Sequence, residues 1–119
     1  MTGRTGPETL TFGGQIAPEE VAALAARGVR AIICNRPDGE EPGQPPFAAI
    51  AAEAARHRIA TCHIPVRPGA ETEDDARAFA AALREMPGPV FAFCRSGGRA
   101  RKLAAMAAQR PDGTERTPS

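Results

Sequence analysis

The residues most able to do chemistry in this 119-residue chain form one short run, Cys94-Arg95-Ser96-Gly97-Gly98-Arg99. The preceding residues, Val90 to Phe93, are apolar with one β-branched and two aromatic side chains, which predicts a buried strand. The following residues, Arg99 to Gln109, have strong helix propensity. Loop amides and a helix dipole supply positive potential where a strand turns into a helix. We therefore predict an anion-binding loop that contains Cys94.

The charges around this loop favour a reactive thiol. Arg95, Arg99, Arg101 and Lys102 lie in or near the first turns of the predicted helix, where the macrodipole disfavours cations. An anion or a thiolate would compensate them. A cysteine in this field should have a depressed pKa, and the thiolate is the nucleophilic form. The alternative is an inert buried thiol beside solvated arginines.

We favour the reactive loop because Cys, Gly-Gly and Arg occur in this order between a strand and a helix. We predict Cys94 and Arg99 as catalytic residues. The predicted substrate-binding residues are Arg95, Ser96, Gly97 and Gly98.

The loop resembles the active loop of the rhodaneses, in which four residues separate a cysteine from an arginine. Cysteine-phosphatase loops are similar but place five residues between the two, and here the corresponding position is Ala100. A shorter ring of amides suits a persulfide sulfur better than a tetrahedral phosphate. The resemblance therefore favours sulfur transfer.

Composition predicts one domain with a modest core. We expect flexible tails at residues 1–8 and 110–119 and a single domain over residues 9–109. The net charge of +1 gives no reason to expect nucleic acid or an anionic membrane as a partner. No apolar run is long enough to span a bilayer, and the N-terminus lacks an apolar signal core.

The cysteine and histidine counts bear on location and cofactors. Three cysteines without paired spacing predict a reducing compartment, so we expect a cytoplasmic protein. With two histidines and no Cys-x-x-Cys pair, we expect no metal site and no cofactor. Cys34 and Cys62 lie in apolar strands and are predicted to be core thiols, although either could serve as a resolving cysteine.

Strands and helices alternate along the chain, which predicts an α/β fold with a small, mostly parallel sheet of about four strands flanked by helices. The predicted strands are Thr9 to Phe12, Val29 to Cys34, Thr61 to Val66 and Val90 to Phe93. The predicted helices begin near Pro18, Phe47, Thr72 and Arg99.

Between the second strand and its helix lies a turn-rich loop, Asn35 to Pro45. Ligands of open α/β sheets bind at the carboxyl ends of strands, so this loop could face Cys94, with Arg36 and Asp38 as auxiliary residues. The alternative is a solvated connector, and sequence alone leaves both open. The carboxylates after Thr72 are more typical of a helix start, because Thr72 and Asp75 resemble a capping box.

A wider resemblance covers most of the chain, from Leu10 to Ala108. The sequence resembles the Blh-type, or beta-lactamase-hydrolase-like, domain family, which is described both as a sulfurtransferase and as phosphatase-like. The matching segments are Gly14-Gln15-Ile16, Asn35-Arg36-Pro37-Asp38-Gly39-Glu40, His63-Ile64-Pro65-Val66, Pro87-Gly88-Pro89-Val90 and Cys94-Arg95-Ser96-Gly97. The family implies a dual-specificity-phosphatase-like fold, in some members fused to a metal-dependent sulfur dioxygenase domain. A sulfur dioxygenase is thus an expected partner, although the 119 residues contain no such second domain.

The likeness to phosphatases of this architecture also implies a general-acid aspartate on a loop after an inner strand. The corresponding stretch, Val66-Arg67-Pro68-Gly69, contains none. Asp38, Glu71 and Asp74 are candidate substitutes. Sulfur transfer needs no strong leaving-group acid, because sulfite or a thiolate can leave as an anion.

The leading hypothesis is therefore a sulfurtransferase. Cys94 would take sulfane sulfur from thiosulfate or glutathione persulfide and pass it to a thiol acceptor, with Arg99 and Arg95 binding the anionic donor. The first alternative is a cysteine-dependent phosphatase with the same nucleophile. The second is a non-catalytic module that binds an anion or a partner.

Overall fold

The computed structural model describes residues 10–109. The predicted tails, residues 1–8 and 110–119, lie outside this range. Within it, no helix is long and apolar enough to cross a membrane.

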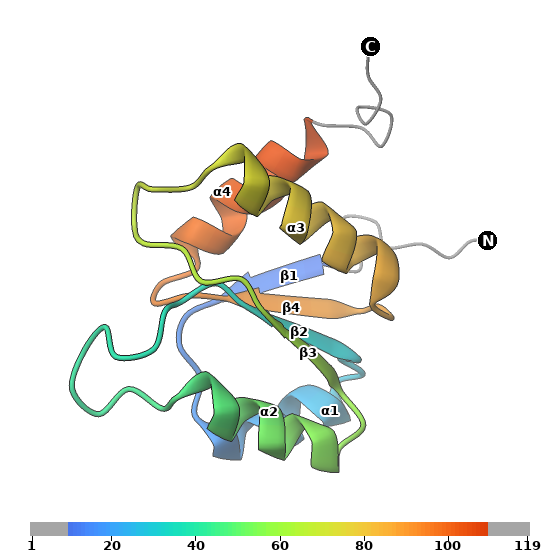
Figure 1. The fold of residues 1–119 in the computed structure, drawn as a ribbon. Helices are drawn as coiled ribbons and strands as arrows, with labels where there is room; N and C mark the ends of the chain where they lie inside the picture. Colours follow the sequence, from blue (N-terminus) through green and yellow to red (C-terminus); the bar gives the residue numbers. More distant parts are fainter. Residues whose placement is uncertain (1–9, 110–119) are drawn as a thin grey trace.

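The described chain builds one four-stranded sheet in which every pairing is parallel (Figure 1). The strands are β1 (Leu10–Gly13), β2 (Ala31–Cys34), β3 (Ala60–His63) and β4 (Val90–Phe93), in the spatial order β1-β4-β2-β3. Because the strands are parallel, their carboxyl ends meet at one edge of the sheet. This arrangement confirms the predicted α/β fold.

Helices cover both faces of the sheet, as Figure 1 shows. One face carries the short 3-10 helix η2 (Pro18–Glu20), α1 (Val21–Ala26) and α2 (Phe47–Arg56). The other face carries α3 (Glu73–Glu85) and α4 (Gly98–Ala108), which pack against each other. The capping box that starts α3 is present, since the Asp75 amide donates to Thr72 Oγ1 at 3.1 Å and the Thr72 amide to Asp75 Oδ2 at 3.0 Å.

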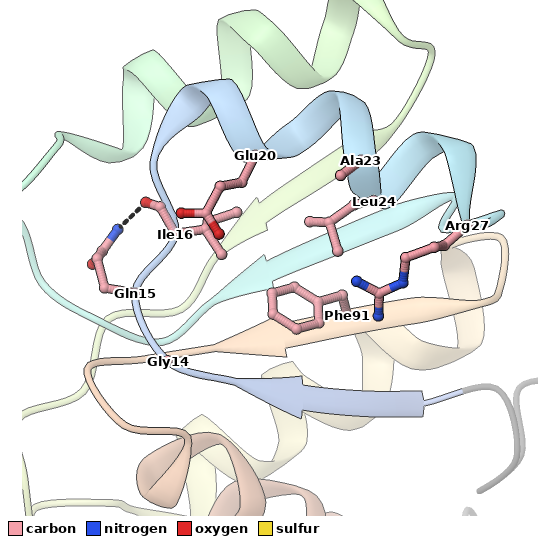
Figure 2. A pocket seen from close by; sticks show the side chains of 8 residues that line it. All are labelled: Gly14, Gln15, Ile16, Glu20, Ala23, Leu24, Arg27 and Phe91. Atoms are coloured by element: carbon pink, nitrogen blue, oxygen red, sulfur yellow. Dashed lines mark hydrogen bonds between the residues drawn. The ribbon is translucent and has the colours of Figure 1, made fainter.

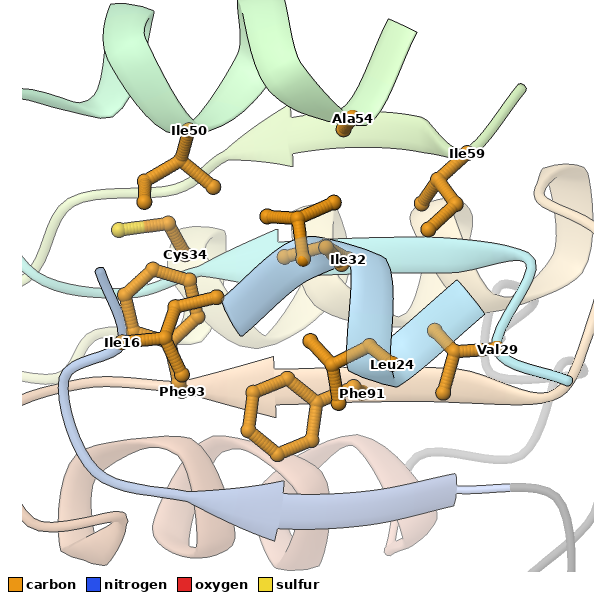
Figure 3. Packing of buried hydrophobic residues seen from close by; sticks show 11 residues of the cluster. Ile16, Leu24, Val29, Ile32, Cys34, Ile50, Ala54, Ile59, Phe91 and Phe93 are labelled. Carbon is orange, nitrogen blue, oxygen red and sulfur yellow. The ribbon is translucent and has the colours of Figure 1, made fainter. Parts of the chain in front are cut away.

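The two central strands are buried on both faces, which explains why their sequences are apolar throughout. One cluster of buried side chains lies under α1 and α2 (Figure 3), and a second lies under α3 and α4. Burying one large apolar side chain contributes about 1.5–3 kcal/mol. This packing fixes the ends of β2 and β4, and with them the loops that come after these strands.

The third strand is shorter than predicted, because β3 ends at His63 rather than at Val66. Pro65 has no amide hydrogen to donate to a sheet ladder. The chain beyond β3 nevertheless stays beside the end of β2, with the Ile64 amide donating to the Cys34 carbonyl at 2.9 Å and the Val66 amide to the Asn35 carbonyl at 3.2 Å. The loop after β3 is therefore held near the loop after β2.

Candidate active site

Cys94 comes directly after β4 and lies at the edge where the carboxyl ends of the strands meet. The residue is only 1% exposed, and the Gly97 amide donates a hydrogen bond of 3.1 Å to its sulfur. Burial raises the pKa of the Cys94 thiol. Hydrogen bonds from the backbone amides of Ala100, Ser96, Arg99 and Gly97 outweigh burial, so the pKa is lowered from its ordinary value. The predicted ring of amides around this sulfur is present.

Two glycines allow this loop to form. Gly97 has a φ of +96°, and a Cβ atom there would lie 2.8 Å from Arg101 Nη1 and 3.3 Å from the Gly13 carbonyl oxygen. At Gly14, a Cβ atom would lie 2.8 Å from the Arg95 carbonyl oxygen. The Gln15 amide donates to that same carbonyl at 3.2 Å. The segment after β1 therefore supports the cysteine loop from one side.

Arg99, in the first turn of α4, is 8% exposed and is held by two acceptors. Its Nη1 donates to Glu40 Oε2 at 2.7 Å and to the Val66 carbonyl at 2.8 Å, and its Nη2 donates to Glu40 Oε1 at 3.0 Å. The hydrogen bond to Glu40 is the main cause of a raised Arg99 pKa, and the Cys94 sulfur contributes to the same shift. The guanidinium therefore interacts with both the Glu40 carboxylate and the Cys94 sulfur.

Arg36 lies beside Arg99 but contacts protein groups on three sides. It is 2% exposed; Nε donates to Glu40 Oε1 at 2.8 Å, Nη1 to Gln15 Oε1 at 3.0 Å and Nη2 to Glu41 Oε1 at 2.8 Å. This bonding suits a residue that holds the site together better than one that binds substrate.

The loop over residues 35–45 faces the cysteine loop. Glu40 pairs with Arg99, and Glu41 Oε2 lies 3.6 Å from Arg95 Nη2. Of the two alternatives that the sequence left open for this loop, the structure shows the one in which it faces the cysteine loop. Arg95 itself is exposed, and so are Ser96 and Gly98, whereas Gly97 is buried.

None of the three carboxylates considered as a general acid forms a hydrogen bond or ion pair with residues 94–99 in the described structure. Asp38 Oδ1 accepts the amide of Phe47, the first residue of α2, at 2.8 Å. Glu71 pairs with Lys102 Nζ at 3.2 Å, and Asp74 pairs with Arg77 in the first turn of α3. Burial opposes ionisation of Glu71, but hydrogen bonds from its own and the Gly69 amides, together with Lys102, hold its pKa below the usual range. The Asp38 carboxylate therefore satisfies the first amide of α2 rather than assisting Cys94.

Sequence reasoning did not single out Glu40 or Gln15. Glu40 lies 59 residues before Arg99, and only the strand order β4-β2 brings the two together. A usable signal was its place four residues after Arg36, in a loop that comes after a buried strand.

The two remaining cysteines differ from Cys94. Cys34 is buried in the cluster under α1 and α2, as Figure 3 shows, and its thiol donates to the Arg36 carbonyl at 3.5 Å. Burial raises the Cys34 pKa to about 11. Cys62 is half-buried, packs against the other cluster and has a pKa raised by burial. Cys34 is therefore a core thiol as predicted, and Cys62 is a partly buried one.

A pocket of about 340 Å³ lies between α1 and the sheet (Figure 2). Leu24, Ile16 and Phe91 provide apolar walls, while Glu20 and Arg27 carry charges at its border. Gly14 and Gln15 also line it, but Cys94 does not. Among the described residues, no three His, Cys, Asp or Glu side chains are grouped so that they could hold a metal ion.

Comparison with known proteins agrees with the fold. The family model described as "Beta-lactamase hydrolase-like protein, phosphatase-like domain" matches residues 3–114. This chain belongs to that family. A beta-lactamase hydrolase-like protein of Agrobacterium fabrum is 43% identical over 96 residues, which are 81% of this chain and 22% of that protein. One from Xylella fastidiosa is 42% identical over 99 residues, or 83% of this chain and 23% of the relative. The chain thus spans less than a quarter of these relatives.

Solved structures of similar fold are described as phosphatases. A Neisseria meningitidis protein described as a "putative phosphatase" is 33% identical, with a TM-score of 0.74 over 79% of this chain and 67% of that one. The core catalytic domain of the PP-IP phosphatase SIW14 from Saccharomyces cerevisiae is 12% identical, with a TM-score of 0.56 over 81% of this chain and 56% of that one, and shows likeness of fold alone. These neighbours confirm the dual-specificity-phosphatase-like fold. The family model and the Neisseria meningitidis structure fit the phosphatase hypothesis better than the sulfurtransferase one. None of these names mentions sulfur transfer.

Proposed function

We propose that this domain is a cysteine-dependent phosphatase that hydrolyses phosphate monoesters or phosphoanhydrides with Cys94 as nucleophile. The observation that carries the proposal is the ring of backbone amides around the Cys94 sulfur, with a lowered thiol pKa. A thiolate held in this way attacks without a separate base. The phosphatase-like family and the phosphatase neighbours support the same chemistry.

The proposed reaction has two steps. The Cys94 thiolate attacks phosphorus, a sulfur–phosphorus bond forms, and the bond from phosphorus to the leaving oxygen breaks with its electron pair on that oxygen. Water then attacks the phosphocysteine, releasing inorganic phosphate and regenerating the thiolate. The loop amides and the start of α4 would stabilise the negative charge on the phosphoryl oxygens in both steps, together with Arg99.

The leaving group sets a limit on the substrate. The segment 66–69 has no aspartate, and Glu71 is ionised at neutral pH because its pKa is lowered. Without a general acid, leaving groups that are stable as anions are favoured, such as phenolates and phosphates. We therefore propose aryl phosphates or phosphoanhydrides as better substrates than alkyl phosphates.

Sulfur transfer is the second candidate, and two observations favour it. Four residues rather than five separate Cys94 from Arg99, and the segment 66–69 offers no acid. In this case the thiolate would take sulfane sulfur from thiosulfate or glutathione persulfide, with sulfite or a thiolate leaving, and a thiol would accept the sulfur. The expected partnership with a sulfur dioxygenase belongs to this candidate. The lowered Cys94 pKa weighs against the third possibility, a non-catalytic binding module.

The two chemistries are separated by one pair of assays on wild type and Cys94→Ser. We expect wild type to hydrolyse an aryl phosphate faster than it transfers sulfur from thiosulfate to cyanide, with both activities absent in the variant. Faster sulfur transfer would reverse the order of the two candidates. Aryl phosphate hydrolysis that survives Cys94→Ser would contradict the phosphatase proposal, and sulfur transfer that survives it would contradict the second candidate.

A further inference from the structure

We infer that Glu40 is a positioning residue that holds the Arg99 guanidinium at Cys94 during the reaction. This inference rests on the proposed function, since it assigns a role in the chemistry of that site. Nothing in the Cys94–Arg99 sequence would show it, because Glu40 belongs to the loop after β2.

The Glu40 carboxylate bridges two arginines, Arg36 and Arg99. Oε1 accepts from Arg36 Nε at 2.8 Å and from Arg99 Nη2 at 3.0 Å, while Oε2 accepts from Arg99 Nη1 at 2.7 Å. Paired N–H···O bonds between a guanidinium and a carboxylate fix the orientation as well as the distance. The Val66 carbonyl is a further acceptor for Nη1. Loss of the Glu40 carboxylate would therefore remove the paired contact and leave Arg99 the single bond to Val66.

Glu40 is itself held in place. Arg36, which donates to it, is tied to Gln15 after β1 and to Glu41 in its own loop. Gln15 in turn donates its amide to the Arg95 carbonyl in the cysteine loop. A connected set of contacts thus runs from the loop after β2 to both ends of the cysteine loop.

Ionisation excludes a role for Glu40 as proton donor at neutral pH. The hydrogen bond from Arg99 lowers the Glu40 pKa to about 2, against the opposing effect of burial and with further help from Arg36. A carboxylate in this state only accepts hydrogen bonds. Its side chain is 20% exposed and faces the two arginines, which are 2% and 8% exposed. The geometry therefore fits positioning rather than acid catalysis.

The test is a double-mutant cycle with Glu40→Gln, Arg99→Ala and the two combined, measured with an aryl phosphate. We expect E40Q to lower kcat about 10- to 100-fold with KM within about threefold, because small misplacement of a catalytic group is costly. R99A should lower kcat about 100- to 1,000-fold. If Glu40 acts through Arg99, the double variant should be no worse than R99A within about threefold.

Glu53→Gln is the matched control. Glu53 is also a partly buried carboxylate beside basic side chains, Arg56 at 3.7 Å and His57 at 3.4 Å, but it lies in α2 and forms no ion pair with Arg36 or Arg99. We expect E53Q to change kcat by less than about threefold. Glu40→Asp is a second variant: it keeps the charge between the arginines but is one methylene too short to bridge them, so kcat should again fall. Unchanged kcat in both Glu40 variants would overturn the inference. An equal fold-loss of kcat from E40Q in the wild-type and R99A backgrounds would also overturn it, because that result would indicate a general structural role.

The cycle has a second readout that needs no turnover, the rate of Cys94 alkylation by iodoacetamide at pH 7. We expect the effects of E40Q and R99A on this rate to be non-additive, and additive effects would overturn the inference. A wild-type protein that is inactive on aryl phosphates but non-additive in alkylation would contradict the proposed function and leave the role of Glu40 standing.

Discussion

Cys34 and Cys94 lie at the ends of neighbouring strands, yet the pKa values of their thiols are shifted in opposite directions. Cys34 ends β2 and pairs with Phe93, the residue before Cys94, and both cysteines are buried. Burial raises the Cys34 pKa to about 11, whereas four backbone amides lower that of Cys94 despite burial. The difference lies in the segment after each strand: a loop over residues 35–46 after β2, but a turn directly into α4 after β4. Local backbone geometry therefore outweighs burial in setting the pKa of Cys94.

The largest expected effect is a difference in alkylation rate between Cys94 and Cys34. At pH 7, a thiol with a pKa near 11 is about one part in 10,000 thiolate, whereas Cys94 titrates below its ordinary value. We expect iodoacetamide to label Cys94 at least about 100-fold faster than Cys34, as read by peptide mapping of the folded protein. The Cys94 rate should level off at a lower pH than that of a free thiol. Equal labelling rates for the two cysteines would contradict the claim that their pKa values are shifted in opposite directions.

An intermediate effect is expected when the cysteine loop is strained. Gly97→Ala places a Cβ atom against Arg101 and the Gly13 carbonyl, and it should lower kcat about tenfold or more and raise the Cys94 pKa. Gly28→Ala is a matched control, since Gly28 has a similar φ of +94° but no heavy atom within 4 Å of the new Cβ. The control should lose about 1 kcal/mol of stability and keep its kinetics. Equal kinetic losses in the two variants would show that loop shape is not the cause of the Cys94 pKa shift.

The smallest expected effect concerns the stability that Glu40, in the loop after β2, contributes to the fold. Because the folded-state pKa of Glu40 is about 2, well below its usual value, this carboxylate stabilises the fold above about pH 4.5, and the contribution is lost as the pH falls towards 2. We expect the free energy of unfolding in urea to fall between pH 5 and 2.5 by about 1–3 kcal/mol more in wild type than in Glu40→Gln. Identical pH dependence in the two proteins would mean that Glu40 is not held by Arg99 and Arg36 in solution.

Much of the fold can be predicted from local sequence patterns. The apolar run before Cys94, the capping box at Thr72 and the proline at the start of η2 are local features, and each predicted its element. The amide ring was predictable for the same reason, because Cys94 to Ala100 is one continuous segment. The end of β3 was not, since the chain there keeps hydrogen bonds to β2 without regular strand geometry.

The rest of the site depends on contacts between distant segments. Glu40 meets Arg99 only because β2 and β4 are adjacent in the sheet, and Gln15 meets Arg36 because β1 lies on the other side of β4. Sequence reasoning placed the loop after β2 at the correct edge but named Asp38, whose carboxylate accepts the first amide of α2, and did not single out Glu40. Which of several carboxylates points inward is decided by loop conformation, which no periodicity encodes.

The most direct test of Cys94 as a phosphatase nucleophile is the covalent intermediate. Wild type would be mixed with an aryl phosphate, quenched in mild acid within milliseconds and examined by peptide mass mapping, with Cys94→Ser as the control. We predict a phosphoryl group on Cys94 and none on Cys34 or on the variant. Aryl phosphate turnover without any phosphoryl-Cys94, or a phosphoryl group on another residue, would contradict the proposed mechanism.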